Sequence, residues 1–480
     1  MSEKEKSSRG SFKGSIGFVL AAAGSAVGLG NIWRFPYLAA KDGGGLFLIV
    51  YITLALTFGF ALLTTEVSIG RFTKQSPLTA YGKVKKGWGW IGRIAYIVPF
   101  LIMPYYCVIG GWVLKYFIAF ATGNGAAAAE DGYFGNFITG HTAPNTPLKE
   151  ASSFILEPVF YLYVFLLVCA IIIYMGVSGG IEKSSRIIMP ILLVLVVGIA
   201  IFALTLKHEN DAGQVTTGLQ GMKVYLVPDF DGLTVRKFFN IVMDALGQLF
   251  YSLSVAMGIM VAYGSYVPDD ANLVKSINQI EFFDTIVAFL AGVMIIPAVI
   301  VFSGKEGMAG GPSLMFVALP KVFMAMGKAG NIIGTLFFAM VLFAAVTSAM
   351  SVLEAIVSSM IDRFKMSRAM ATVIESVIAM VLGVVVCLGY NLWYFDKKLP
   401  NGSHAQILDV MDYISNYILM PVVAIGTCLL IGWVVKPKFI MDEATKNGEK
   451  FGRKGLYIAM IKVVAPILLV VLLLMSLGII

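Results

Sequence analysis

The chain has 480 residues, of which 58% are apolar and only 13% are charged. Soluble domains carry about 25% charged residues, so this composition excludes a disordered chain and a set of soluble domains, and it predicts that lipid is the main solvent. The net charge of +8 would also suit a nucleic-acid-binding protein. In a membrane protein, however, basic residues gather in cytoplasmic loops, and we expect no nucleic acid partner.

Eleven apolar segments are long enough to cross a bilayer as helices, which takes about 20 residues. They are 15–37, 44–69, 94–122, 156–176, 187–206, 238–266, 276–303, 331–361, 369–390, 405–435 and 456–478. With the N-terminus in the cytoplasm, the inner connecting segments hold 22 Lys and Arg residues and the outer ones hold 11. This bias predicts a multi-pass protein of the plasma (inner) membrane, with its N-terminus inside and its C-terminus outside.

The segment 304–330, which follows the seventh span, is apolar but is interrupted by glycine and proline. Such residues break helices. We therefore expect a short re-entrant or capping helix pair on the outer face. A surface loop with an amphipathic turn is the alternative.

The first span is too irregular for a plain helix. Gly24, Gly28 and Gly30 lie close together in it, and Asn31 and Arg34 follow. Glycine is a poor helix former, and asparagine and arginine are costly in lipid unless they face protein or water. A helix-packing motif would explain the pair Gly24 and Gly28 alone. An unwound segment that exposes backbone groups at a ligand site explains the whole set.

The sixth span is irregular in the same way, because Gln248, Ser252 and Ser254 interrupt its apolar run and Gly258 follows. A single membrane serine usually bonds to its own helix. The pairing of two interrupted spans, five spans apart, is more informative, because it is typical of secondary transporters built from inverted repeats. In such proteins the ligand site lies at mid-membrane between two broken helices.

Other polar residues inside the spans are the pair Tyr105 and Tyr106, Asp284, and the pair Thr347 and Ser348. An intramembrane carboxylate is a functional-site candidate by default, whereas a Thr–Ser pair is more often structural. Asp284, Thr347 and Ser348 offer only oxygen ligands. Because hard cations prefer oxygen, a sodium-like ion fits better than a transition metal.

At this point the chain resembles the neurotransmitter:sodium symporter family, in particular its bacterial amino-acid transporter branch. The resemblance runs from about Arg9 to the end of the chain and rests on these runs: GSAVGLGNIWRFPY with GGG at 43–45, EVSIGR at 66–71, YY at 105–106, GGW at 110–112, QLFYSLSVAMG, DTIVAFLAG with IPAV at 284–299, AAVTS at 344–348 and LDVMD at 408–412. It implies an all-α membrane protein with a LeuT-like five-plus-five inverted repeat, helices 1 and 6 unwound at mid-membrane, and one extra helix. The expected parts are a cytoplasmic segment 1–14, a first repeat 15–206, a second repeat 238–435 and an eleventh helix 456–478.

The resemblance also implies two sodium sites and one substrate site. The first sodium site would use the carbonyl of Ala26 and the side chains of Asn31, Ser252 and Asp284, together with the substrate carboxylate. The second would use the carbonyls of Gly24, Val27 and Ala344 and the hydroxyls of Thr347 and Ser348. The substrate carboxylate would meet the Gly30 N–H and the Tyr106 hydroxyl, and its ammonium would meet the carbonyls of Ala26, Tyr251, Ser252 and Ser254. The side-chain pocket would be lined by Ile102, Tyr251, Ala256, Met257, Ser348 and Val352.

Two charge pairs would act as gates, according to the same resemblance. Arg34 and Asp412 would form the outer pair, with Tyr251 as a lid over the substrate. Arg9 and Asp362 would form the inner pair. For each pair an ordinary interfacial charge is the alternative.

Three departures from the family pattern refine the expectation. Members that carry monoamines have an aspartate where this chain has Gly28, so a substrate with its own carboxylate is favoured. Chloride-dependent members have a serine where this chain has Ala288. Although Tyr51, Gln248 and Ser252 match the rest of that chloride site, we hypothesise that Asp284 supplies the negative charge instead. Many relatives have a twelfth span that this chain lacks, and a monomer or weak dimer is expected.

The sequence thus predicts a sodium-coupled symporter that imports a neutral, hydrophobic or aromatic L-amino acid, in a membrane of lipid and with no organic cofactor. An ion channel or a non-transporting amino-acid sensor on the same fold is the alternative. An enzyme is not expected, because the four cysteines and three histidines are scattered and no nucleophile–base pair, metal cluster or phosphate loop occurs. The choice between leucine-like and tryptophan-like substrates stays open, because the Ala256 methyl narrows the pocket while Met257 is adaptable.

Overall fold

The computed structural model describes residues 10–209, 213–308 and 310–479. Within these ranges nine helices are long and apolar enough to cross a membrane: Gly45–Thr73, Gly89–Ala121, Glu157–Tyr174, Val177–Thr205, Leu273–Ser303, Gly327–Phe364, Arg368–Leu388, Ile407–Val434 and Lys454–Ser476. A tenth span is the pair Ser15–Ala26 and Gly30–Lys41, which is bent by 52°. The predicted sixth span holds two shorter helices, which agrees with eleven crossings.

In chain order, the first half contains α2 (Ser15–Ala26), η1 (Gly30–Arg34), α3 (Phe35–Lys41), α4 (Gly45–Leu54), η2 (Ala55–Gly59), α5 (Phe60–Thr73), α6 (Pro77–Val84), α7 (Gly89–Ala121), α8 (Gly125–Ala128), α9 (Tyr133–Thr139), η3 (Leu148–Glu150), α10 (Glu157–Tyr174), η4 (Val177–Glu182) and α11 (Lys183–Thr205). The η segments are short 3-10 or π turns. Most of the π turns continue directly into an α-helix, as η2 does between α4 and α5, so they belong to the same span.

The second half contains β1 (Lys207–Glu209), β2 (Val215–Thr217), α12 (Gly218–Leu226), α13 (Val235–Leu253), α14 (Ile259–Ser265), α15 (Leu273–Ser303), η5 (Lys305–Gly307), η6 (Leu314–Ala318), α16 (Leu319–Ala325), η7 (Gly327–Ala329), α17 (Gly330–Phe364), α18 (Arg368–Leu388), β3 (Lys397–Lys398), β4 (His404–Ala405), α19 (Ile407–Asp412), η8 (Tyr413–Leu419), α20 (Met420–Leu429), η9 (Leu430–Val434), α21 (Lys438–Ala444), α22 (Lys454–Ala459), η10 (Met460–Val464) and α23 (Ala465–Ser476). The strands form two antiparallel hairpins, with Lys207 opposite Thr217 and Lys397 opposite Ala405.

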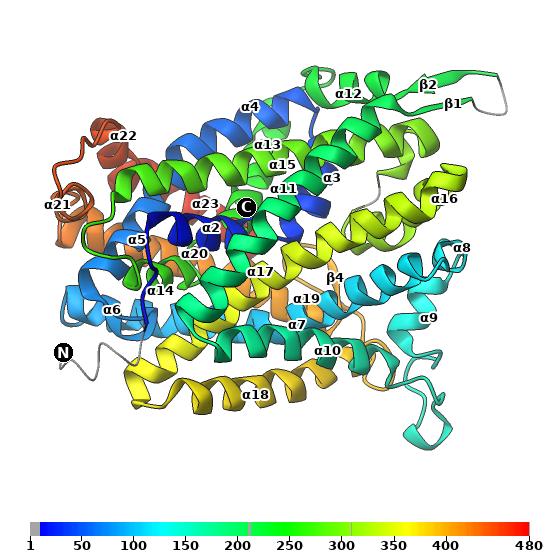
Figure 1. Ribbon diagram of the computed structural model, residues 1–480. Helices are drawn as coiled ribbons and strands as arrows, with labels where there is room; N and C mark the ends of the chain where they lie inside the picture. Colours follow the sequence, from blue (N-terminus) through cyan, green and yellow to red (C-terminus); the bar gives the residue numbers. More distant parts are fainter. Residues whose placement is uncertain (1–9, 210–212, 309, 480) are drawn as a thin grey trace.

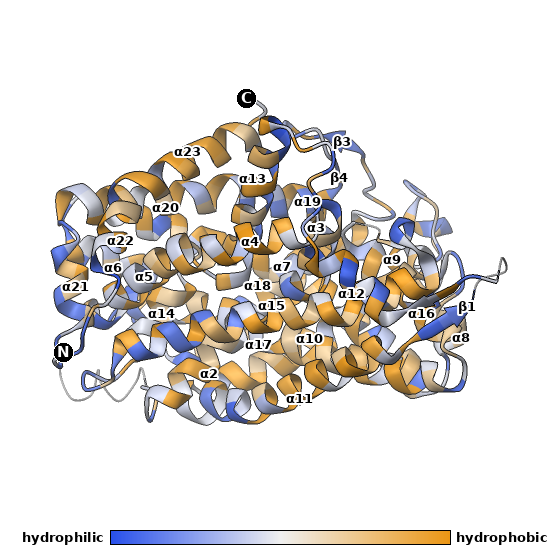
Figure 2. Ribbon diagram, turned by 90° about the horizontal axis from the view of Figure 1, so that it is seen from above, coloured by the Kyte–Doolittle hydropathy of each residue, from blue (hydrophilic) through white to orange (hydrophobic). Residues whose placement is uncertain are grey.

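The long helices run roughly side by side, and the short elements cover the two ends of the bundle (Figure 1). α5, α6, α21 and α22 lie at the end that also holds the N-terminus, called here the N-terminal end, while β1, β2, α8, α9 and α16 lie at the opposite end. The C-terminus lies beside the β3–β4 hairpin in Figure 2. The backbone of Pro400 accordingly lies against Gly478.

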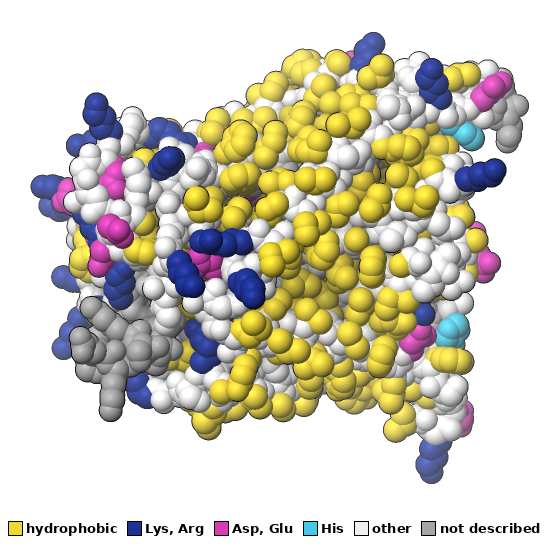
Figure 3. Space-filling model, in the orientation of Figure 1, with side chains coloured by type: hydrophobic (Ala, Val, Ile, Leu, Met, Phe, Trp, Pro, Cys, Tyr) yellow, Lys and Arg dark blue, Asp and Glu magenta, His cyan; other side chains and the backbone are white. Residues whose placement is uncertain are grey.

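Helix α2 lies inside the bundle, where it packs against α11, α15 and α17. Its residues from Ala21 to Ala26 are all buried. Helices such as α11 and α18 instead expose large apolar side chains, with Val194 exposed by 72% and Val381 by 59%. Figure 3 shows a surface of mostly apolar side chains over the middle of this face of the bundle. A surface of this kind is stable only against lipid. Because lipid covers it, the protein does not need the charged surface that keeps a soluble domain in solution.

Both predicted breaks are present. Helix α2 ends at Ala26, and Val27 and Gly28 form a bend before the chain becomes helical again. Helix α13 ends at Leu253, and the chain resumes a helix only at Ile259. In the second break Ser254 and Ala256 have positive φ angles of 54° and 62°, a conformation that costs a non-glycine residue about 1–2 kcal/mol. The two interruptions leave backbone groups without intrahelical partners deep in the bundle.

The segment 304–330 differs from the expected helix pair. It contains one continuous apolar helix, η6 with α16 from Leu314 to Ala325, flanked by two 3-10 turns. Helix α16 packs against α17. Pro320 lies where the π turn η6 passes directly into α16. The helix therefore continues through the proline instead of being divided there.

Candidate functional site

The carboxylate of Asp284 on α15 lies at the centre of a buried hydrogen-bond network. Its Oδ1 accepts a bond from Asn31 Nδ2 at 2.9 Å and from the Ser252 hydroxyl at 2.6 Å. Its Oδ2 accepts a longer bond, of 3.4 Å, from the Tyr51 hydroxyl. Asn31 and Ser252 come from the two broken spans. The structure therefore brings together three of the four residues predicted for the first sodium site, with Ala26 at the adjoining end of α2.

The carbonyl of Ser25, near the end of α2, is a second meeting point. It accepts bonds from the hydroxyls of Ser254 and Ser348, each at 3.0 Å. The hydroxyls of Ser25 and Ser254 also lie 3.1 Å apart. Thr347 Oγ1, in contrast, bonds to its own helix, at the carbonyls of Phe343 and Ala344. One carbonyl thus links the first, sixth and eighth spans.

Two glycines let α17 approach the broken first span. A Cβ at Gly24 would lie 3.2 Å from the Thr347 Cβ, and a Cβ at Gly28 would lie 2.9 Å from the Ser348 hydroxyl oxygen. Close approach of this kind is available only to glycine. It places the Thr347 and Ser348 side chains beside the backbone that the second sodium site was predicted to use.

Gly30 and Tyr106 border the predicted substrate carboxylate position. A Cβ at Gly30 would lie 2.3 Å from a ring carbon of Tyr251, so the Tyr251 ring rests directly on the Gly30 backbone. The Tyr106 hydroxyl is buried, lies 3.4 Å from the position of a Cβ at Gly28, and makes no hydrogen bond of good geometry among the described residues; the Ser348 hydroxyl and the Leu29 backbone are its polar neighbours. Buried hydroxyls are nearly always bonded, and this one therefore points to a ligand.

The residues predicted for the side-chain pocket are buried, except for Tyr251, which is half-buried. Ile102, Ala256, Met257 and Val352 are at most 4% exposed. The strained turn at Ala256 is held in place, because its N–H donates to Glu66 Oε1 at 2.7 Å. Glu66 thus has a structural partner in the broken sixth span.

A cavity of about 310 Å³ opens above Tyr251, and Arg34 is one of its walls. Arg34 donates to the Tyr417 hydroxyl at 3.3 Å. Asp412 accepts from the Tyr105 hydroxyl at 3.0 Å and from Asn416 Nδ2 at 2.5 Å. Arg34 and Asp412 do not form a direct ion pair within 4.0 Å in this conformation; the predicted gate residues stand on the same side of the site with separate partners.

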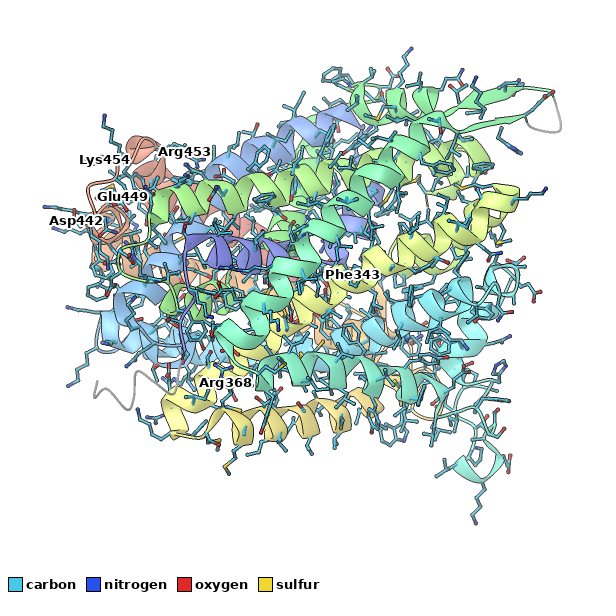
Figure 4. The ribbon with its side chains drawn as sticks, in the orientation of Figure 1. Phe343, Arg368, Asp442, Glu449, Arg453 and Lys454 are labelled. Atoms are coloured by element: carbon cyan, nitrogen blue, oxygen red, sulfur yellow. The ribbon has the colours of Figure 1, made fainter. Side chains whose placement is uncertain are left out.

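The inner gate is described only in part, because Arg9 lies outside the described residues. Asp362 accepts the Ser76 N–H at 2.6 Å, at the start of α6. Nearby on the same helix, Glu354 forms a two-pronged ion pair with Arg368, at 2.6 and 2.9 Å, and accepts a bond from the Tyr266 hydroxyl. Arg368 is labelled at the N-terminal end of the bundle in Figure 4. Glu354 is therefore fully partnered.

Sequence reasoning missed Ser25, Asn416 and Tyr417. Ser25 contributes a carbonyl, which every residue has, so no residue type marks it. Asn416 and Tyr417 lie in η8, a π turn, and π turns in helices often occur at functional sites. Asn416 could have been identified from the sequence, because an asparagine inside an apolar span is costly in lipid and marks a candidate functional position.

Two helices broken at mid-bundle, with backbone carbonyls, serine hydroxyls and one carboxylate facing each other across the breaks, define a secondary transporter of the inverted-repeat class. The model of the sodium:neurotransmitter symporter family matches residues 9–129 and 148–479. The chain belongs to this family, whose members are sodium-dependent transporters and not enzymes.

Relatives cover the chain almost end to end. It is 33% identical to an uncharacterised sodium-dependent transporter of Methanocaldococcus jannaschii, over 96% of this chain and 89% of that protein. It is 32% identical to one from Bacillus subtilis, over 97% of both, and 25% identical to the human sodium- and chloride-dependent GABA transporter 2, over 91% of this chain and 74% of that protein. The crystal structure of MhsT in complex with L-phenylalanine superposes with a TM-score of 0.82 at 31% identity, over 98% of this chain and 100% of that one. The fold is therefore the LeuT-like fold that the resemblance implied.

Proposed function

We propose that this sodium-coupled transporter imports a neutral L-amino acid with a hydrophobic or aromatic side chain. The observation that carries the proposal is the Tyr106 hydroxyl, which is buried, makes no hydrogen bond of good geometry among the described residues, and lies beside Gly28 and the unwound segment. A substrate carboxylate would accept a hydrogen bond from this hydroxyl. It would also accept one from the N–H of Gly30, at the positive end of a half-helix. The phenylalanine bound to MhsT is a substance of this class.

Gly28 supports a substrate that brings its own carboxylate. A Cβ there would lie 2.9 Å from the Ser348 hydroxyl and 3.4 Å from the Tyr106 hydroxyl, so the protein places no acidic side chain at this point. An amine without a carboxylate would then leave the Tyr106 hydroxyl unpaired, which costs about 1–3 kcal/mol for a buried polar group. The buried, mostly apolar pocket disfavours charged side chains for the same reason.

Two sodium ions are proposed as the coupling ions. The first would bind Asp284, Ser252, the Asn31 side-chain oxygen and the Ala26 carbonyl, and the substrate carboxylate would complete this shell. In the structure Asn31 Nδ2 donates to Asp284, and Asn31 Oδ1 accepts from the Gly28 N–H. The side-chain amide of Asn31 must therefore rotate by about half a turn before its oxygen can bind an ion beside Asp284. The second would bind the carbonyls of Gly24, Val27 and Ala344 with the hydroxyls of Thr347 and Ser348. No organic cofactor is proposed.

Chloride independence is proposed from the same carboxylate. The human relative is named as chloride-dependent. Here Ala288 offers no hydroxyl to an anion, while Asp284 already presents a negative charge within reach of Tyr51 and Ser252. A chloride ion beside this carboxylate would be repelled.

The proposed cycle starts with sodium at both sites and the path through the outer cavity open. The substrate completes the first sodium site. Tyr251 and the outer gate residues Arg34 and Asp412 then close over the substrate. Finally the inner half of the first span moves and releases the substrate inside. The basic N-terminal end is proposed to be cytoplasmic. Inward movement of each sodium then gains about 2.3 kcal/mol per 100 mV of membrane potential.

Uptake of radiolabelled amino acids by proteoliposomes tests the proposal. We expect saturable accumulation that requires a sodium gradient, together with competition by phenylalanine, leucine or tryptophan but not by lysine or glutamate in a panel of twenty amino acids. Sodium conductance without accumulation would favour a channel, and sodium-dependent binding without accumulation would favour a sensor.

A further inference from the structure

A polar pocket of about 370 Å³ lies at the N-terminal end of the bundle, away from the substrate site. One wall is the first three turns of α15, and the other is the segment that precedes α22. The lining residues are Asn272, Val274, Lys275, Asn278, Gln279, Phe282, Glu449 and Lys450. Figure 4 labels Glu449 at this end of the bundle, as it does Arg453, Lys454 and Asp442. The transport cycle proposed above uses none of these residues.

The pocket is held open by bonds on both of its flanks. On one flank, Asn447 Nδ2 donates to the Asp269 carbonyl at 2.9 Å and Lys446 pairs with the Asp269 carboxylate at 2.7 Å. On the other, Arg453 pairs with Glu281 at 2.7 Å and donates to Asn278 Oδ1 at 2.6 Å. Both walls are therefore fixed before any ligand arrives, which lowers the cost of ordering a site.

These flanking bonds also decide which charges remain for a ligand. Asp269, Glu281 and Glu443 are each paired with a basic residue. Lys275 and Lys450, in the pocket itself, form no ion pair within the part of the chain that the structure describes, and Glu449 is the single acidic group in the lining. Two ammonium groups and one carboxylate give the pocket a net charge of +1, which matches a singly charged phosphodiester.

The lining changes from polar to apolar along one helix face. Lys275, Gln279 and Phe282 are spaced so that they lie on one side of α15, and seven residues of helix span about 10 Å. Phe282 is 63% exposed on a helix that crosses the membrane. A ligand that touches both ends must therefore carry a charged head and an apolar tail in the same orientation as a lipid.

We propose that this pocket binds the head group of an anionic phospholipid, with Lys275 and Lys450 on the phosphate and the acyl chain along Phe282. Basic pockets between membrane helices bind such head groups by charge. The occupant differs from a free phosphate because Phe282 offers nothing to an inorganic ion. The site does not depend on what the protein transports.

Site-specific quenching tests this. The full chain carrying Phe282→Trp is purified in detergent, and its tryptophan fluorescence is measured while brominated phosphatidylglycerol or brominated phosphatidylcholine is added. The same titration of the parent protein, which keeps Phe282, measures the quenching of the six native tryptophans, and this is subtracted. We expect saturable quenching with a clear preference for phosphatidylglycerol. Lys275→Gln with Lys450→Gln should weaken this binding about 25-fold, because each lysine contributes roughly a fivefold gain at an anionic surface.

The matched control is Lys85→Gln with Lys86→Gln, which removes the same charge from two exposed lysines at the same end and should leave quenching unchanged. Equal quenching by both lipids, or an unchanged response in the Lys275/Lys450 variant, would overturn the proposal. Displacement of the brominated lipid by inorganic phosphate as effectively as by unlabelled phosphatidylglycerol would overturn it in favour of a free-anion site. If the double variant does not stay monodisperse, Lys450→Gln alone is measured and should lose about fivefold.

Discussion

Asn31 donates a side-chain N–H to Asp284 Oδ1 at 2.9 Å, although 253 positions separate the two residues. The bond ties the broken first span to the only carboxylate of the predicted sodium sites. Ser252, from the broken sixth span, donates to the same oxygen at 2.6 Å. A change in the charge or partners of Asp284 therefore acts on both broken helices together.

Replacing Asp284 by Asn tests the sodium site and the source of negative charge. We expect uptake either to be abolished or to become chloride-dependent, because the sodium ion loses a charged ligand and an anion must replace it. Interactions with a charged group are worth about 1.5–3 kcal/mol, so sodium affinity should fall at least about tenfold. Uptake is measured with sodium titrated in chloride and in gluconate. The control is Asp270→Asn, at an exposed loop position; chloride-independent uptake equal to wild type in Asp284→Asn would refute the assignment.

Replacing Tyr106 by Phe tests the carboxylate contact. The hydroxyl makes no hydrogen bond of good geometry among the described residues, so its removal should change thermal stability little. Substrate affinity should fall by about 10- to 100-fold, the loss expected for a hydrogen bond to a charged group. Scintillation proximity binding of labelled amino acid measures it. Tyr174→Phe, at a 59% exposed position, serves as control, and an unchanged affinity in Tyr106→Phe would contradict the proposed substrate orientation.

Replacing Gly30 by Ala tests the close approach of Tyr251. The new Cβ would lie 2.3 Å from a ring carbon, so the ring or the unwound backbone must shift. Overpacking costs about 1–3 kcal/mol, and we expect substrate affinity to fall about tenfold or more. Gly135→Ala adds a Cβ with nothing within 4 Å and should have no effect. Wild-type binding in Gly30→Ala would show that Tyr251 does not need its observed position.

Replacing Ala256 by Gly tests the strained turn and the width of the pocket. A φ of 62° costs alanine about 1–2 kcal/mol, while glycine costs about 0.5–1 kcal/mol in chain entropy and the loss of the buried methyl costs about 0.8 kcal/mol, so little net change in stability is expected. Loss of the Ala256 methyl should also widen the pocket, so tryptophan should compete for uptake better, relative to leucine, than it does in the wild type. Thermal unfolding and the competition panel give the two readouts. Ala371→Gly, in the helix α18, should instead destabilise by about 1 kcal/mol; a similar loss in Ala256→Gly would contradict the strain argument.

Much of the architecture followed from composition. The apolar segments gave the spans because about 20 apolar residues suffice to cross lipid, and glycine with buried polar residues marked both breaks. The helix from Leu314 to Ala325 was not foreseen as a single unit, because a proline inside an apolar segment predicts a helix end, whereas here a π turn precedes Pro320 and the helix continues through it. The hairpins and short helices at the two ends were missed too, since short elements lack a strong apolar period.

The sequence by itself therefore determined the solvent, the broken helices and the family, because all of these follow from residue types and their spacing. Only the tertiary structure decided the partners: that Ser254 and Ser348 meet on the Ser25 carbonyl, that Arg34 turns to Tyr417 rather than Asp412, and that Lys275 and Lys450 border one pocket. Backbone carbonyls carry no sequence signal. Contacts between distant helices depend on how closely the backbones approach, which packing sets and local sequence does not.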